Sequence, residues 1–218
     1  YLLLVFTTLC WGFHAVLGKL IIGEISPMAT VSIRWFGVAT LLLVFFNQPV
    51  RRDWPLLRPH LWFFSIMGIL GYASFNAIFY VAAHSTSGVN MGILQGSIPI
   101  FVFMGAFFIY RTPVTLMQAG GVSLAFIGVV IVASSGDFVN LKNLTFNLGD
   151  ILMICACVLY AGYTVGLRNR PHVSAMGMFT VMVGAAFLAS LVMVGFEIYF
   201  GQFLAPSPKG WVIAILIT

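Results

Sequence analysis

The residues best suited to bind a small molecule lie within 84–113, where an apolar run contains a proline. From Thr86 to Tyr110 the sequence carries no charged side chain, and a run of this length spans a bilayer as a helix. Pro99 lies inside the run and, because it lacks an N–H, leaves the carbonyl of Gln95 without its usual helical donor. Gln95 therefore combines a carbonyl and a side-chain amide roughly 13 Å from Thr86, near the membrane centre.

Two interpretations of this interruption stay open. Broken backbone at that depth is tolerated inside protein or beside a water-filled cavity, and in transporters such breaks mark the substrate site. The alternative is a packing kink whose carbonyl is satisfied by a neighbouring Ser or Thr. The first interpretation predicts that Gln95 and Pro99 line a binding site.

Two titratable side chains lie well inside apolar runs. Arg34 lies roughly 10 Å beyond Pro27 along a helix, and a charge in a membrane span is a functional candidate by default. The alternative is an arginine that binds helix-end carbonyls or extends to the interface. His14 could take up a proton during a transport cycle, or be an ordinary core histidine. No Asp or Glu lies deep in any apolar run.

Amide and aromatic side chains complete the candidate site. Tyr72, Asn76 and Tyr80 recur every four residues and so share one helix face, while Asn90 is expected to bond between helices. Tyr160 and Tyr163 in the sixth apolar run lie mid-span rather than in an interfacial belt, which suits the walls of a pocket; the alternative is packing against lipid. The predicted substrate-binding residues are Trp11, His14, Arg34, Asn76, Gln95, Pro99, Tyr160 and Tyr163.

The composition excludes a soluble domain. Hydrophobic residues make up 61% of the chain and charged residues 7%, against about 25% charged in soluble proteins, and the mean hydropathy is +1.07. The net charge of +5 does not indicate nucleic-acid binding, because the arginines lie in short loops rather than on one basic face. The three cysteines form no metal-binding pattern, so neither a metal nor a cofactor is predicted.

The hydropathy pattern predicts an all-α polytopic membrane protein with seven helices and the start of an eighth. The expected helices cover 1–22, 27–47, 60–83, 86–110, 114–134, 148–167 and 174–196, with another beginning near 211. Positive charge gathers on one side of these helices, at Arg51, Arg52, Arg58, Arg111, Arg168 and Arg170. The positive-inside rule then predicts cytoplasmic loops at 48–59, 111–113 and 168–173 and a cytoplasmic N-terminus, in a bacterial inner membrane.

The sequence also contains a weak internal repeat. Aligned without a gap, residues 159–168 follow residues 10–19, so that Trp11 meets Tyr160, His14 meets Tyr163 and Lys19 meets Arg168. The offset holds five expected spans, and an odd number of spans turns the second copy upside down. This arrangement predicts the inverted repeat that is common in secondary transporters.

Several loose motifs, spread over essentially the whole chain, resemble the EamA family of the drug/metabolite transporter superfamily. They are Trp11-Gly12 with Lys19, Ser26-Pro27 with Arg34, Thr86-Ser87 with Pro99, Gly120-Gly121, Gly128-Val129, and Gly149-Asp150 with Tyr160-Ala161. One departure is the stretch Tyr110-Arg111-Thr112-Pro113, where the family often has a Glu after the fourth helix. Any role tied to that carboxylate is in doubt here.

The resemblance implies ten helices in two five-helix repeats around a central cavity. Residues 1–136 would form the first repeat, and residues 147–218 would form a second repeat without its C-terminal helices. The implied function is secondary transport by alternating access, with export of small metabolites such as amino acids, and no enzymatic activity. The expected partners are a small-molecule substrate and the lipid bilayer, with no nucleic acid; a homodimer is left open.

Three other functions are weighed against this one. A sugar-phosphate or nucleotide-sugar carrier of the same superfamily would need several deep cations, and Arg34 and Lys19 alone qualify. A membrane-embedded enzyme would need a catalytic cluster such as paired carboxylates or an HxxxH pair, which the sequence lacks. A retinal-binding receptor would need a lysine deep in 174–196, and that run has none.

Overall fold

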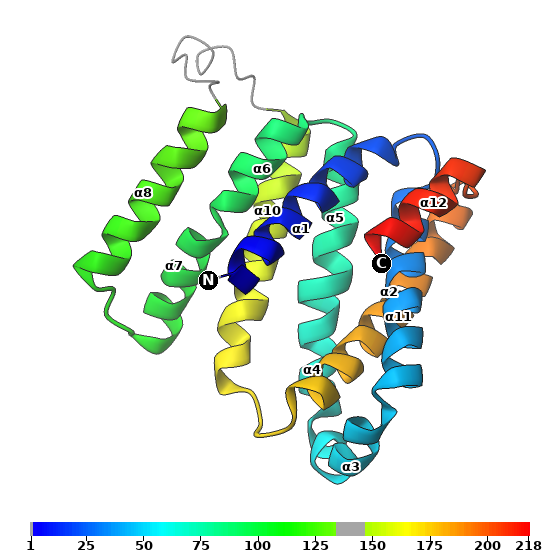
Figure 1. Ribbon diagram of the computed structural model, residues 1–218, viewed down its shortest axis with the longest axis horizontal. Helices are drawn as coiled ribbons and strands as arrows, with labels where there is room; N and C mark the ends of the chain where they lie inside the picture. The colour runs from blue at the N-terminus through cyan, green and yellow to red at the C-terminus, as the bar shows by residue number, and fades with distance from the viewer. Residues whose placement is uncertain (1, 134–146) are drawn as a thin grey trace. The chain divides into compact units, whose positions relative to one another are not determined.

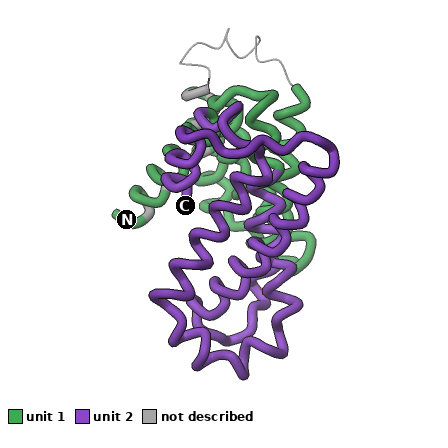
Figure 2. The backbone as a smooth tube through the Cα atoms, turned by 90° about the vertical axis from the view of Figure 1, so that its right-hand side faces the viewer, with its two compact units in different colours: residues 1–19, 78–165 green, residues 20–77, 166–218 purple. Residues whose placement is uncertain are grey.

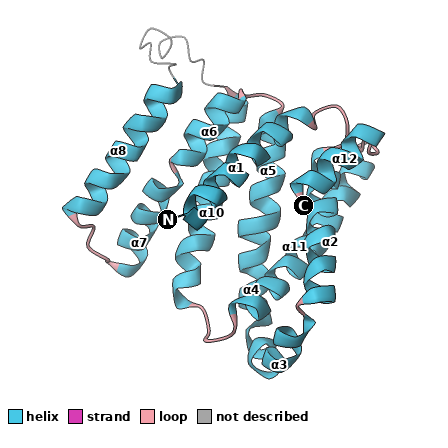
Figure 3. Cartoon of the chain, in the orientation of Figure 1, coloured by secondary structure: helices cyan, strands magenta, loops and turns pink. Residues whose placement is uncertain are grey.

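The fold is helical throughout the part of the chain that the structure describes. The computed structural model describes residues 2–133 and 147–218, and each regular element in these ranges is a helix (Figure 1 and Figure 3). Helical segments long and apolar enough to cross a membrane cover Pro27–Phe45, Asn47–Ala83, Gly88–Tyr110, Leu148–Asn169 and Ala175–Tyr199. Shorter apolar helices cover Val5–Leu20, Leu116–Gly128 and Pro208–Ile217. These findings confirm the prediction of an all-α, multi-pass membrane protein.

The described residues group into two compact units (Figure 2). Unit 1 consists of residues 1–19 and 78–165, and unit 2 consists of residues 20–77 and 166–218. Each unit therefore combines segments from both halves of the sequence. The division into 1–136 and 147–218 concerns repeats in the sequence rather than compact units, and it stays a prediction.

Serine and proline set the beginnings of several helices. The hydroxyl groups of Ser87, Ser174 and Ser207 each accept a backbone N–H bond from three residues further on, which caps a helix N-terminus. The helices that these serines begin are α6 (Gly88–Gly96), α11 (Ala175–Tyr199) and α12 (Pro208–Ile217). In α2 (Pro27–Phe45) the first position is a proline, whose fixed φ suits that position.

The third predicted span is preceded by a helix, so 48–59 is largely helical where a loop was predicted. Its cytoplasmic location stays a prediction. α3 covers Asn47–Leu57 and is followed by a short 3-10 helix, Arg58–His60. Pro49 falls in the first turn, where a missing N–H costs no hydrogen bond, whereas Pro55 lies inside the helix, in its last turn. One turn apart on α3, Asp53 and Leu57 are both buried, so α3 presents an inward-facing side.

The span itself is interrupted by a π-helix. α4 covers Leu61–Gly68, the π-helix covers Ile69–Ser74, and α5 covers Phe75–Ala83. A π-helix is wider than an α-helix and often occurs at a functional site. The hydropathy pattern does not contain this feature, because an apolar run looks the same whichever hydrogen-bond spacing its backbone adopts.

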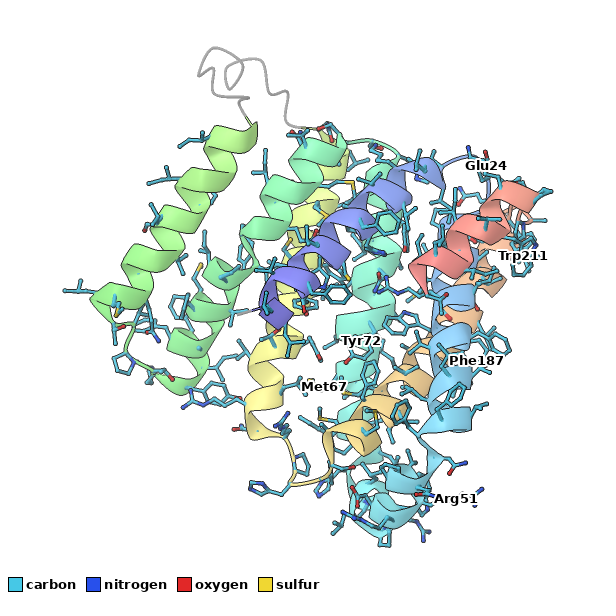
Figure 4. All side chains as sticks on the ribbon, viewed as in Figure 1. Glu24, Arg51, Met67, Tyr72, Phe187 and Trp211 are labelled. Atoms are coloured by element: carbon cyan, nitrogen blue, oxygen red, sulfur yellow. The ribbon has the colours of Figure 1, made fainter. Side chains whose placement is uncertain are left out.

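Unit 2 is built around α11, which packs against α2, α3, α4 and the π-helix, while α12 packs on α2 (Figure 1). The rings of Phe36 on α2 and Phe187 on α11 lie 5.5 Å apart, centroid to centroid (Figure 4). Gly68 allows a close approach of α4 and α11, because a Cβ atom there would lie 2.2 Å from the carbonyl oxygen of Met182. α4 and α11 are thus in contact through their backbones at Gly68.

Unit 1 contains α1 (Leu2–Leu20), most of α5, α6, α7 (Ile98–Tyr110), α8 (Leu116–Ala133) and α10 (Leu148–Gly166). α10 begins against the end of α5, where a Cβ atom at Gly149 would lie 2.8 Å from the carbonyl oxygen of Ala82. Near its other end, the carbonyl of Val165 accepts a hydrogen bond of 3.2 Å from the hydroxyl of Tyr110. α10 is thus held at both ends within unit 1.

Candidate functional site

Three of the predicted aromatic residues come together in unit 1. The rings of Trp11 on α1 and Tyr160 on α10 lie 6.3 Å apart at an angle of 88°. Tyr160 and Tyr163 lie one turn apart on α10, with their rings 5.4 Å apart at 62°. Both tyrosines are half-buried, whereas Trp11 is 47% exposed. The repeat alignment paired Trp11 with Tyr160, and these two residues are in contact.

His14 packs against α5 in the same unit. Its ring stacks on Phe79 at 5.4 Å, and its Nε2 lies 3.5 Å from the hydroxyl oxygen of Tyr80. Gly18, one turn further along α1, leaves room for this contact, because a Cβ atom there would lie 3.1 Å from the Phe79 ring. The aromatic side of α5 therefore holds the imidazole ring of His14.

The interruption predicted at Pro99 is present. α6 ends at Gly96 and α7 begins at Ile98, and the carbonyl of Leu94 gathers the hydrogen bonds at the break. It accepts from the backbone N–H of Ser97 at 3.0 Å and from the thiol of Cys157 at 3.3 Å. The hydroxyl of Ser97 donates to the same carbonyl at 2.5 Å. The packing-kink interpretation places such a hydroxyl on the carbonyl of Gln95 instead, so the choice between the two interpretations stays open. Gln95 itself is half-buried, and Pro99 is exposed.

The break and the aromatic residues are connected through α10. Cys157 contacts the break, and Tyr160, one turn later on α10, contacts Trp11. Within unit 1 the middle of α10 thus adjoins both the α6–α7 break and α1. His14, three residues after Trp11 on α1, links this group to α5.

Arg34 and Asn76 meet in unit 2. The guanidinium group of Arg34 donates a hydrogen bond of 2.9 Å to Oδ1 of Asn76, and Nδ2 of Asn76 donates one of 2.7 Å to the carbonyl of Tyr72. Asn76 is 4% exposed, so this chain of hydrogen bonds is shielded from solvent and ends on the π-helix. Arg34 is thus linked directly to the side chain of Asn76 and, through Asn76, to the backbone of the third span.

Sequence reasoning missed the aromatic surroundings of this arginine. The guanidinium carbon of Arg34 lies 5.1 Å from the centroid of the Trp35 ring, and Trp35 stacks on Tyr72 at 4.9 Å. The indole N–H of Trp35 is buried with no hydrogen-bond acceptor among the described residues. An arginine over a Trp ring gains a cation–π attraction. The adjacency of Arg34 and Trp35 in the sequence was the available signal.

Two carboxylates cap the ends of the α2–α11 pair in unit 2. Glu197, near the end of α11, accepts from the hydroxyl of Ser26 at 2.6 Å and from the backbone N–H of Met28 at 2.9 Å. Asp53, which follows α2, accepts from the backbone N–H of Ser174 at 3.1 Å. A carboxylate at a helix N-terminus satisfies free N–H groups and complements the helix dipole. α2 and α11 are therefore antiparallel, and each N-terminus is capped by an acid that lies in or after the C-terminal half of the other helix.

The other described acids are also bound to helix beginnings. Asp150, 2% exposed in the first turn of α10, accepts hydrogen bonds from the hydroxyl of Thr86 and from Nδ2 of Asn90, the latter at 3.2 Å. This contact confirms the prediction that Asn90 bonds between helices. Glu24 binds the beginning of α12 through Ser207 and Lys209 (Figure 4). The Ser207 hydroxyl, followed by the Lys209 ammonium group, holds the pKa of the Glu24 carboxyl below its ordinary value.

The described residues contain no group of three His, Cys, Asp or Glu side chains that could hold a metal ion. What unit 1 brings together is instead a mid-span group of aromatic rings beside an interrupted helix. An arrangement of this kind binds small molecules by shape and a few polar contacts.

Comparison with known proteins decides the family. Residues 1–134 match the model of the EamA-like transporter family, which is more than half of the chain. The chain belongs to this family. EamA-like proteins are transporters rather than enzymes, so the resemblance seen in the loose sequence motifs is confirmed.

Relatives of this EamA-family chain carry transporter names. It is 29% identical over 196 residues to the uncharacterized transporter YyaM of Bacillus subtilis (strain 168), which covers 86% of this chain and 63% of that protein. It is 23% identical over 202 residues to the uncharacterized transporter YetK of the same organism, covering 92% and 61%. An uncharacterized transporter of Archaeoglobus fulgidus is 28% identical over 167 residues, covering 76% and 56%. No solved structure matches the chain. The chain thus spans less than two thirds of the length of these relatives.

Proposed function

We propose that the protein is a secondary transporter that exports small metabolites, such as amino acids or related compounds, by alternating access. Membership of the EamA-like family supports transport. The observation that carries the proposal is the meeting, in unit 1, of the α6–α7 break with the middle of α10, whose Tyr160 contacts Trp11. Interrupted helices at mid-membrane mark substrate sites in transporters.

The reciprocal caps of α2 and α11 support an inverted repeat of five-helix units. Ser26 and Ser174 begin the second helix of each predicted repeat, and each is bound by a carboxylate, Glu197 or Asp53, that lies in or beyond the C-terminal half of the other helix. An antiparallel pair with matching caps at its two ends is what a two-fold axis in the membrane plane generates. Alternating access would then exchange the conformations of the two repeats.

In this proposal the substrate lies against the aromatic rings of unit 1. Gln95 supplies polar contacts, Trp11, Tyr160 and Tyr163 supply the walls, and Pro99 keeps the helix interrupted. His14 supports these residues from α1. Separately, in unit 2, Arg34 and Asn76 are proposed to favour substrates that carry a carboxylate, which must meet a cation or a dipole where water is scarce.

The test is export of a metabolite panel by cells with and without the gene, together with matched variants. Gln95→Leu should lower export more than Asn90→Leu, because Asn90 is bonded to Asp150 at a helix end. Membrane insertion of both variants is checked by immunoblot of membrane fractions. If Gln95→Leu and Pro99→Ala both export normally, the break is a packing kink and the proposed site is wrong.

A further inference from the structure

α3 and the residue that follows it carry two arginines and a tryptophan on one exposed side. Arg51, Trp54 and Arg58 follow one another at spacings of three and four residues, and Arg58 keeps helical dihedral angles, with φ −54° and ψ −44°. These spacings place the three side chains along one side of the helix. All three residues are exposed, whereas Asp53 and Leu57 are buried on another side. We call Arg51, Trp54 and Arg58 the arginine stripe.

The arginine stripe lies at the boundary of the membrane. α3 connects two apolar helices, since α2 ends at Phe45 and α4 begins at Leu61, and Figure 1 shows α3 at the ends of both. Arg51 is labelled at this end of unit 2 in Figure 4. A segment that joins two membrane spans lies at the level of the lipid headgroups, whichever way the protein is inserted. Tryptophan is enriched at this level, and Trp54 is 45% exposed there.

The positive charge of the arginine stripe is not neutralised by the described acids of unit 2. Asp53 is turned inward, where it accepts hydrogen bonds from the Arg52 guanidinium and from a backbone N–H at the beginning of α11. Glu24 and Glu197 lie near the beginning of α2, whereas α3 follows its end. In the described part of the chain, neither arginine of the stripe forms an ion pair. Both guanidinium groups are therefore free to bind an anion.

We propose that the arginine stripe binds the headgroup phosphate of an anionic phospholipid, such as phosphatidylglycerol, in the leaflet that α3 adjoins. A guanidinium group pairs with a phosphate through two parallel N–H···O bonds. Interfacial helices that combine arginines with an exposed tryptophan bind anionic membranes in this way. The indole of Trp54 between the two arginines favours a lipid over free phosphate, because a lipid also supplies apolar groups to cover the ring. The inference concerns the surrounding lipid and does not depend on the transported substrate.

The experiment compares three probes on the purified natural protein in a neutral detergent, with binding followed by microscale thermophoresis. The probes are dioctanoyl phosphatidylglycerol, dioctanoyl phosphatidylcholine and glycerol 3-phosphate. Phosphatidylglycerol should bind at least about fivefold more tightly than phosphatidylcholine, the effect of one arginine at about 1 kcal/mol. This preference should shrink when NaCl is raised from about 0.05 M to about 0.5 M, because salt screens exposed charges. Equal affinity for the two lipids, or glycerol 3-phosphate binding as tightly as phosphatidylglycerol, would overturn the proposal without any variant having to fold.

Variants then locate the lipid on α3. Arg51→Gln combined with Arg58→Gln should lower the affinity for phosphatidylglycerol to that for phosphatidylcholine. Arg52→Gln is the matched control, because it removes one charge from the same helix at a side chain that is paired with Asp53, and it should change the affinity less than about twofold. If Arg52→Gln weakens binding as much as Arg51→Gln alone, the total charge of α3 attracts the lipid and the arginine stripe is not a site.

Discussion

The link between Arg34 and Asn76 allows a quantitative test of how unit 2 is held together. Asn76→Leu removes the acceptor of the Arg34 guanidinium and the donor to the Tyr72 carbonyl, both in a residue that is 4% exposed. Arg34→Met removes the charge while keeping a long side chain beside Trp35. The two single variants and the double variant form a double-mutant cycle, which gives the coupling energy between Arg34 and Asn76.

The size of the coupling energy follows from the kind of hydrogen bond. Bonds to charged groups contribute about 1.5–3 kcal/mol in soluble proteins, and hydrogen bonds between membrane helices average about 0.6 kcal/mol, with a maximum near 1.7. Because the Arg34 donor is charged and Asn76 is buried, we expect a coupling energy of about 1–2 kcal/mol, at the upper end of the membrane values. The assay is reversible unfolding in mixed micelles with increasing denaturing detergent.

A matched cycle in the same unit serves as the control. Ser190 on α11 is buried and donates to the carbonyl of Phe187, so Ser190→Ala changes a different hydrogen bond of the same unit. The effects of Ser190→Ala and Arg34→Met should add within about 0.5 kcal/mol. A coupling energy for Arg34 and Asn76 no larger than in this control would refute the link.

Three further predictions concern packing, pH and orientation. Gly68→Ala should destabilise the protein by about 1–3 kcal/mol through overpacking, because the added Cβ would meet the Met182 carbonyl, whereas Gly184→Ala, where a Cβ meets nothing within 4 Å, should be neutral or stabilising in the same unfolding assay. Glu24 has a folded-state pKa below its ordinary value, so its contribution is present above the unfolded-state pKa and is lost as the pH falls through the folded-state pKa. Thermal unfolding from about pH 7 to about pH 3 should show that loss, and Glu24→Gln should remove it; equal pH dependence in the two proteins would contradict the assignment. In a cysteine-free background, Gln48→Cys should resist an impermeant thiol reagent added to intact cells while Gln202→Cys reacts, because the positive-inside rule predicts that the arginine-rich connections are cytoplasmic. Reaction of Gln48→Cys from outside would reverse the predicted orientation.

The helices and the helix break followed directly from the sequence. Long charge-free runs have few alternatives to membrane helices, and Pro99 cannot supply the N–H that a continuous helix needs. The contact between Trp11 and Tyr160 could be anticipated because the repeat aligned them. α3 was missed because the helices were predicted from apolar runs, and this segment carries the charged residues Arg51, Arg52 and Asp53.

Other parts of the site could not be predicted from local pattern. The π-helix at Ile69–Ser74 depends on how α4 packs against α11, which residue types in the span do not encode. At the break, the carbonyl that accepts the hydrogen bonds is that of Leu94. One donor is the thiol of Cys157 on α10, and local sequence does not show which residue of another helix reaches the break. The pairing of Arg34 with Asn76 required knowing which faces of two helices meet, and a four-residue spacing on one helix does not give that information.

The reciprocal caps on α2 and α11 have a mechanical consequence. Because Glu197 binds one end of the pair and Asp53 binds the other, sliding α2 along α11 by one residue would break both attachments together. The direct contact of α4 and α11 at Gly68 resists translation of α4 along α11 in a similar way. We therefore expect α2 and α11 to move as one rigid body, which can tilt but in which neither helix slides along the other. A covalent cross-link between the two helices should then leave transport intact.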